Sequence, residues 1–161
     1  MDNTQSVSWE NKLQVVGNEL RALSLALPAG IDSDGLSRLR AALQDKLGAS
    51  LPDFFAGFLQ KSDGLTWNGV TLYGSQARQY PELPIPELIA ENIAVRQHPT
   101  RPIRSGTFIG HDELSAFFVD ESDGRVHSLD KTTLVEHGSA RSGEDFLVAV
   151  LSVDDGDGAD G

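Results

Sequence analysis

Acidic residues in two successive turns are the strongest chemical signal in this sequence. Asp112 and Glu113 lie in one expected turn, and Asp120, Glu121 and Asp123 lie in the next. Such a cluster can attract a basic protein and raise its association rate. Turn carboxylates can also hold a hard cation, but they are far more often solvated. We therefore treat these five residues as candidate partner-binding residues and predict no metal site.

The histidines and serines show no spacing typical of a catalytic or metal site. His98, His111, His127 and His137 are well separated, without the paired spacing of metal ligands. The sequence has no GxSxG turn and no GxxxxGK[ST] phosphate loop. The acidic run 154–158 lacks the bidentate glutamate of a calcium loop. We therefore predict a protein that is not an enzyme and needs no cofactor.

The composition is that of a globular chain with a strong acidic balance. Its 161 residues, 39% of them hydrophobic, suffice for one domain with a core. The formal net charge of −11 argues against binding to nucleic acid or to a membrane surface, because both are negatively charged. The absence of cysteine excludes disulfides. We expect a cytoplasmic protein, because no membrane-spanning run or signal-peptide pattern occurs.

Helical periodicity predicts two helices in the first fifty residues. The first is capped by Ser8, ends at Pro28 and Gly30, and carries an apolar stripe of Trp9, Leu13, Val16, Leu20, Leu23 and Leu27. The second begins at Asp32 or Asp34 and ends at Gly48, in the position of a left-handed C-terminal cap. Its apolar residues are Leu36, Leu39, Leu43 and Leu47.

The stretch Leu47–Ser75 predicts a short aromatic helix followed by a hairpin. Ser50 is the expected cap of this third helix, with Pro52 near its first turn. Phe54, Phe55, Phe58 and Leu59 form its apolar side, and Asp63-Gly64 ends it. Asn68-Gly69 predicts a tight hairpin turn, since both residues tolerate positive φ.

The rest of the sequence predicts a helix, an antiparallel meander and a last helix. The first helix spans Glu87–Gln97, with Leu88, Ile89 and Ile93 facing inward. Ser142 is expected to cap the last helix. The expected strands are Thr107–Gly110, Ser115–Asp120, Arg125–Asp130 and Thr132–Glu136. We predict a single α+β domain over residues 1–153 and a disordered acidic tail over residues 154–161.

These elements and motifs resemble the SUKH superfamily, which includes yeast cell-wall-assembly regulators and many bacterial immunity proteins. The resemblance rests on Leu47-Gly48, Leu51-Pro52, Phe54–Leu59 and Asp63-Gly64, which match the family signature lG..LP..y..fl...nG. Asp63 stands where the family usually has Asn. The later run FIGHDELSAFFVD, with its following Asp-Gly turn, is also similar. The resemblance covers roughly residues 31–151 and implies N- and C-terminal helices packed against a mostly antiparallel sheet.

The resemblance also implies a function, with which the charge distribution agrees. Bacterial members of the family are typically immunity proteins that bind and inhibit a cognate toxin, often a nuclease. Residues 106–161 hold three Lys/Arg against thirteen Asp/Glu, a net of −10, so nearly all of the excess acid lies there. An acidic inhibitor can occupy or flank the basic groove of a nuclease. We therefore expect a cognate toxin with a basic surface, such as a nuclease, as the partner.

Asp63, Trp67 and Tyr73 are lesser candidates for partner contacts. Aromatic residues near a hairpin are more often part of the core, but an exposed one would anchor an interface. Two other functions stay open: a regulatory adaptor of the same fold that scaffolds a cellular complex, and a domain that binds or converts a small molecule.

Overall fold

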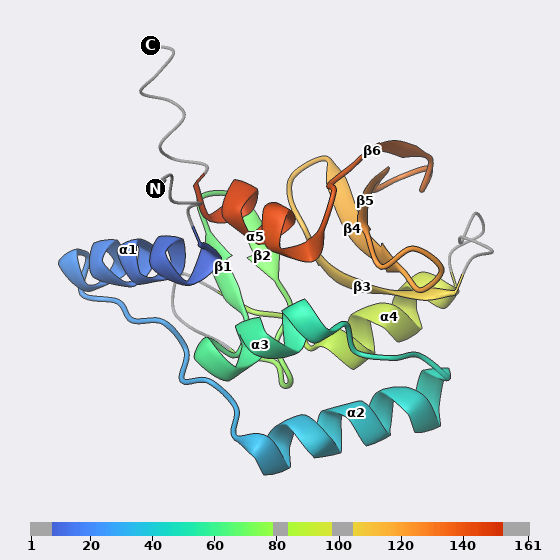
Figure 1. Cartoon of the computed structure of the whole chain (residues 1–161), viewed down its shortest axis with the longest axis horizontal. Helices are drawn as coiled ribbons and strands as arrows, with labels where there is room; N and C mark the ends of the chain where they lie inside the picture. The colour runs from blue at the N-terminus through green and yellow to red at the C-terminus, as the bar shows by residue number, and fades with distance from the viewer. Residues whose placement is uncertain (1–7, 79–83, 98–104, 153–161) are drawn as a thin grey trace, which may run out of the picture.

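Within residues 8–78, 84–97 and 105–152, which the computed structural model describes, the chain forms five helices and one six-stranded sheet (Figure 1). This confirms the α+β class. The helices are α1 (Trp9–Ala22), α2 (Ser33–Leu47), α3 (Asp53–Lys61), α4 (Leu88–Arg96) and α5 (Gly143–Leu151). The strands are β1 (Leu65–Trp67), β2 (Val70–Leu72), β3 (Gly106–His111), β4 (Ser115–Asp120), β5 (Val126–Asp130) and β6 (Glu136–Ser139). The expected tail, residues 154–161, lies outside the described residues.

The sheet is an antiparallel meander in which each strand pairs with the next along the chain. Its order is β1-β2-β3-β4-β5-β6. Asn68 and Gly69 join β1 to β2 with φ of 54° and 88°, which confirms the predicted turn. A register shift between Phe108 and Gly110 interrupts the pairing of β3 with β4. Short connections therefore place every turn between β3 and β6 at one of the two ends of the sheet.

The helices flank the sheet and share one hydrophobic cluster with it (Figure 1). Helix α4 packs on β3, α1 and α3 pack on α5, and α2 packs on α3 and α4. The largest fully buried side chains come from both layers and include Phe55, Phe58, Phe118, Ile109 and Leu147. Gly143, at the start of α5, faces the Phe54 ring, which a Cβ would overlap. Burial of these apolar surfaces is the main stabilising contribution to the fold.

Local capping signals predicted several helix ends correctly. Asp32 caps α2 by accepting a hydrogen bond from the Gly35 N–H at 2.8 Å. Gly48 ends the same helix with φ of 61°. Ser142 caps α5 through the Asp145 N–H at 3.1 Å. These signals succeed because a cap depends on neighbours within four residues.

Two helix boundaries differ from the prediction. Helix α1 ends at Ala22 rather than at Pro28, because Ser24 adopts φ of 66° and turns the chain. Leu23 is therefore 65% exposed instead of lying on the buried stripe. Helix α3 begins after Pro52, not after a Ser50 cap. The Ser50 N–H instead donates to Glu121 Oε2 at 3.1 Å.

Two inward-facing positions and one strand also differ. In α4, Ile93 is 40% exposed, whereas Asn92 is buried and bonds to β3. The expected strand Thr132–Glu136 is mostly a turn, because Asp130 accepts hydrogen bonds from the Thr132 and Thr133 N–H groups. Leu134 then takes φ of 60°, and the pairing strand is β6.

Candidate partner-binding surface

The structure separates the two acidic turns that the sequence singles out. Asp112 and Glu113 precede β4, and Glu121 and Asp123 follow it. Strand β4 has six residues, which places the turns about 20 Å apart at opposite ends of the sheet. They therefore cannot form one continuous patch, and each must be judged by its own surroundings.

Hydrogen bonds within the protein hold the carboxylates of the β4–β5 turn. Asp120 is 2% exposed and accepts from the Ser122 N–H at 2.8 Å and hydroxyl at 2.7 Å. Glu121 accepts from Ser50, as described above. Asp123 Oδ1 accepts from the Arg125 N–H at 2.8 Å. The prediction of Asp120 as a contact residue is thus wrong, because its side chain is buried as part of the turn.

The electrostatics of Asp123 fit this structural role. Partial desolvation raises the pKa of Asp123, but hydrogen bonds from the Arg125 N–H and from His127 outweigh it and hold the pKa below its ordinary value. The carboxylate is therefore ionised near neutral pH and already has cationic or donor neighbours. The turn therefore keeps the negative charge of Asp123, which the neighbouring Arg125 partly balances.

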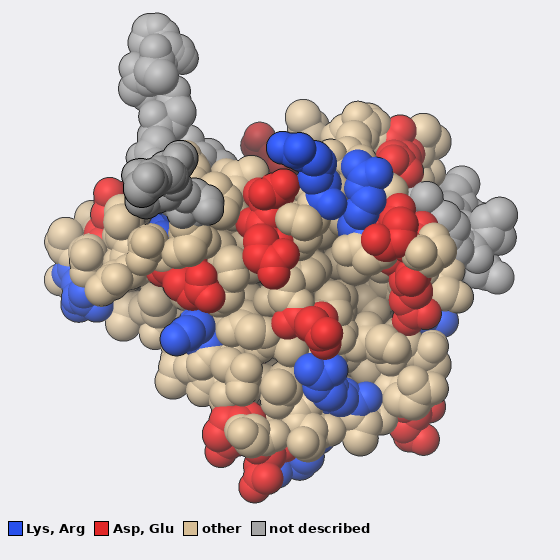
Figure 2. Space-filling model, in the orientation of Figure 1, with Lys and Arg blue, Asp and Glu red and all other residues tan. Residues whose placement is uncertain are grey.

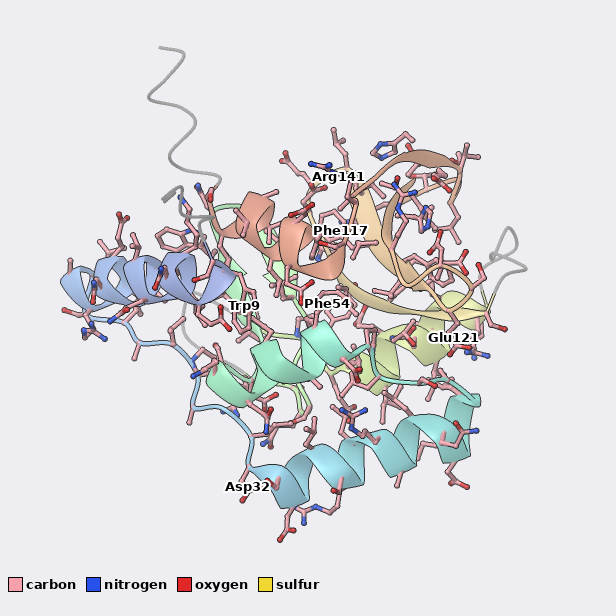
Figure 3. All side chains as sticks on the ribbon, in the orientation of Figure 1. Trp9, Asp32, Phe54, Phe117, Glu121 and Arg141 are labelled. Carbon is pink, nitrogen blue, oxygen red and sulfur yellow. The ribbon has the colours of Figure 1, made fainter. Side chains whose placement is uncertain are left out.

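A shallow hollow of about 520 Å³ lies beside this turn, between the starts of α3 and α5. Its charged lining residues are five acids and two arginines: Asp53, Asp120, Glu121, Asp123, Glu144, Arg125 and Arg141. Figure 3 shows Phe54 between α3 and α5, with Arg141 on one side and Glu121 on the other. On the face drawn in Figure 2, acidic and basic side chains are interleaved. The hollow thus has mixed charge with an acidic excess, to which the buried Asp120 contributes little exposed surface.

Asp63 and Tyr73 are buried, which corrects their prediction as contact residues. Asp63 is 0% exposed; it accepts from the Ser75 N–H at 2.7 Å and hydroxyl at 2.6 Å, and it pairs with Arg78 at 3.2 Å. Tyr73 is 4% exposed, and its hydroxyl bonds to His111 Nδ1 at 2.9 Å. Burial, and then the charge of Glu91, raise the pKa of Tyr73 well above its ordinary value. Trp67 is half-buried at the hairpin and stays a prediction.

Asp63→Ala is expected to lower the free energy of unfolding by about 3 kcal/mol. The change leaves Arg78 without its carboxylate and the Ser75 N–H without an acceptor. Urea unfolding followed by circular dichroism measures the loss. Asp53→Ala is the matched control. Asp53 is exposed, and its surface ion pair with Arg40, at 3.9 Å, is expected to contribute little stability. A loss for Asp63→Ala no larger than that control would contradict this role.

The other end of the sheet carries exposed apolar residues that the sequence analysis missed. Leu114 is 76% exposed and Val135 is 64% exposed. They lie in adjoining turns, because the Lys131 N–H donates to the Leu114 carbonyl at 3.0 Å and the Asp130 N–H donates to the Val135 carbonyl at 2.9 Å. We call this region the sheet-end surface; it comprises Asp112, Glu113, Leu114, Asp130, Lys131, Val135 and Glu136.

The sheet-end surface combines its apolar residues with an acidic rim. Of the seven residues that define it, four are acidic, namely Asp112, Glu113, Asp130 and Glu136, and one, Lys131, is basic. Asp112 Oδ1 fixes the first turn by accepting from the N–H groups of Leu114 and Ser115 at 3.0 and 2.7 Å. A hollow of about 590 Å³ adjoins it, lined by Asn68–Thr71 and His111–Ser115. Apolar anchors within a charged rim are typical of protein interfaces.

His111 lies between the hairpin and this surface, where its charge state is constrained. Burial and Lys131 lower the pKa of His111, and Asp112 opposes them. Because the folded pKa lies below the unfolded value of 6.5, stability from neutral His111 is present above about pH 6.5 and is lost as pH falls through the folded pKa.

A His111→Asn variant is therefore expected to lose less stability than the wild type when pH falls from about 7.5 to about 5.5. Comparing the two proteins removes the contribution of the other titrating groups, which both share. Urea unfolding at each pH measures the difference. Equal losses in the two proteins would show that His111 titrates alike in the folded and unfolded states.

One group of described side chains has the atoms of a metal site. Ligand atoms of Asp120, Asp123 and His127 all lie within 4.8 Å of one another. The sequence pattern indicated only the turn acids as possible cation ligands, whereas β5 brings His127 back toward the turn. The spacing 120, 123 and 127 is the only signal that could have found it.

No protein-family model and no curated protein matches this chain. The similarity to the SUKH superfamily thus rests on the residues quoted above. None of the helices in the described ranges is both long and apolar enough to cross a bilayer.

Proposed function

We propose that this protein is an immunity protein, which binds a cognate toxin with a basic surface and inhibits it. The observation that carries the proposal is the sheet-end surface, where exposed Leu114 and Val135 lie in adjoining turns that also carry acidic residues. The residues that resemble the SUKH superfamily point to the same class of function. In this proposal the protein is cytoplasmic, needs no cofactor and performs no catalysis.

The chemistry of the surface determines what the partner must present. Leu114 and Val135 would fill apolar depressions of the partner and contribute binding energy by removing their apolar surface from water. The carboxylates of Glu113 and its neighbours would pair with Lys and Arg side chains at the rim, which mainly speeds association and favours the right partner. A nuclease meets these needs, because its substrate groove must be basic to bind phosphates.

Co-expression with the toxin tests this proposal. The partner to use is the C-terminal domain of a large toxin gene beside the gene for this protein. Under the proposal, cells that express the domain die, cells that express both proteins survive, and the two proteins purify together in a one-to-one complex. Failure to rescue the cells and to form a complex would contradict it.

A regulatory adaptor is the second candidate, because the same apolar and acidic surface would suit a scaffold. An adaptor predicts stable association with a housekeeping complex and no rescue from a toxin. The same co-expression and purification separate the two functions.

A further inference from the structure

His127 contacts Glu136 at the edge of the sheet-end surface and has an unusual polar setting. It is on β5, 6% exposed, with carboxylates on both ring nitrogens. Asp123 Oδ2 lies 3.0 Å from Nε2, and Glu136 Oε2 lies 2.9 Å from Nδ1. Asp120, itself buried at the end of β4, contributes a further carboxylate oxygen within 4.8 Å of the other two ligand atoms. Two neighbouring strands and one turn thus bring carboxylates to a single imidazole on β5.

Glu136 gives this cluster a feature that turn acids alone lack. It belongs to β6 and stands outside the group of three ligand atoms. The Glu136 carboxylate accepts the Nδ1–H and fixes the orientation of the ring, so Nε2 points toward Asp123 and Asp120. A metal ion would take the place of the Nε2–H···Asp123 hydrogen bond, with release of that proton. In metal sites a ligating histidine almost always donates its second N–H to a carboxylate, carbonyl or water in this manner. The imidazole is therefore oriented and buried before any ion arrives.

We propose that His127, Asp123 and Asp120 bind one divalent transition-metal ion, Zn²⁺ foremost, with Glu136 as the positioning residue. His127 Nε2 and one oxygen from each aspartate are the three protein ligands, and water completes a tetrahedral set. An imidazole nitrogen favours Zn²⁺ over Mg²⁺ or Ca²⁺, which prefer oxygen ligands alone. The bound ion would connect the β4–β5 turn to the adjoining ends of β4 and β5 and would stabilise this turn.

The distances suit an ion after a small adjustment. Ligand atoms that lie about 2.0–2.2 Å from Zn²⁺ in a tetrahedral site are about 3.3–3.6 Å from each other. The 3.0 Å separation between Asp123 Oδ2 and His127 Nε2 must widen slightly. The Asp120 carboxylate oxygen, now within 4.8 Å of the other two ligand atoms, must move toward them. The side chain of Asp123 is 38% exposed, so the ion and its water have a path from solvent. No backbone rearrangement is required.

Metal titration of the purified full chain tests the site without any toxin. Protein first treated with a chelator is titrated with Co²⁺, followed by visible absorption, and with Zn²⁺, followed by calorimetry. We expect one site per chain, visible bands of tetrahedral Co²⁺, displacement of Co²⁺ by Zn²⁺, and a raised Tm. A folded wild type that shows neither Co²⁺ bands nor heat with Zn²⁺ would overturn the proposal.

Substitutions then assign the ligands. Asp123→Asn and His127→Gln are each expected to weaken Zn²⁺ binding at least tenfold, and Glu136→Gln is expected to weaken it about 10- to 100-fold through the orientation of His127. Asp34→Asn, at an exposed remote acid, is the control and should bind as the wild type does. Asp123→Asn decides the matter if His127→Gln does not fold. Unchanged binding in Asp123→Asn would refute this ligand set.

Discussion

An Asn92→Ala variant is expected to lose about 3 kcal/mol of unfolding free energy. Asn92 is 2% exposed and connects α4 to the irregular part of β3. Its side-chain oxygen accepts from the Phe108 N–H at 2.8 Å, and its amide donates to the Phe108 carbonyl at 2.8 Å and the Leu88 carbonyl at 2.9 Å. Alanine would leave both polar groups of Phe108 buried without these partners.

Thermal unfolding followed by circular dichroism measures this effect, and a Tm lower by roughly 10 °C is expected for a chain of this size. Ile93→Ala is the matched control on the same helix, because Ile93 is 40% exposed. That variant should stay within about 0.5 kcal/mol of the wild type. If the two variants lose equal stability, Asn92 does not connect α4 to β3 as we describe.

The double variant Leu114→Ser, Val135→Ser is expected to weaken toxin binding roughly 100-fold, or about 3 kcal/mol. Both side chains protrude into solvent, at 76% and 64% exposure, so the unbound protein does not depend on them for its core. In the proposed complex they supply the apolar area that partner binding removes from water. Surface plasmon resonance with the immobilised toxin domain should show the loss chiefly as faster dissociation.

Two exposed apolar residues of α1 provide a matched control. Val15 is 53% exposed and Leu23 is 65% exposed, and neither belongs to the sheet-end surface. Val15→Ser, Leu23→Ser should bind the toxin domain with unchanged affinity. Equal weakening by the two double variants would show that general surface hydrophobicity, rather than this surface, matters. Unchanged toxin binding by the Leu114→Ser, Val135→Ser variant would show that the interface lies on another surface of the protein.

The sequence was a reliable guide wherever a few neighbouring residues determine the local conformation. The Asp32 and Ser142 caps, the left-handed Gly48 and the Asn68-Gly69 turn all depend on contacts within one turn. Strand β4 was also predicted with its observed bounds, because the run SAFFVD is rich in β-forming residues. These elements sufficed for the α+β class.

Tertiary contacts determined what periodicity could not. Asn92 faces inward in place of Ile93 because β3 offers it two backbone partners. The turn after β5 forms in place of a strand because the Asp130 carboxylate accepts hydrogen bonds from the Thr132 and Thr133 N–H groups. Helical and strand patterns average over such single contacts, so the errors fall at positions where one polar side chain decides the local structure.

The sequence also could not show which acidic residues of the candidate site are exposed. Asp63 and Asp120 look like surface acids in the sequence, yet both are buried because each finds several donors. Glu113 was predicted and is exposed in the sheet-end surface. Leu114 was overlooked because a single apolar residue in a turn has no periodicity to mark it. Val135 was overlooked because the sequence placed it in the expected strand Thr132–Glu136. Only the pairing of the turns around β5 brings these two residues together.

Calorimetric titration of the wild-type protein with the neighbouring toxin domain tests the central claim most directly. We predict one-to-one binding. Its association rate, measured in parallel by stopped flow, should fall as ionic strength rises from about 0.01 to about 0.15 M. The physical reason is that the Debye length shortens from about 30 to about 8 Å, which screens attraction between the two proteins. Glu113→Lys should lower the same rate at low salt. Absence of binding, or binding indifferent to both salt and Glu113→Lys, would contradict the proposed acidic interface.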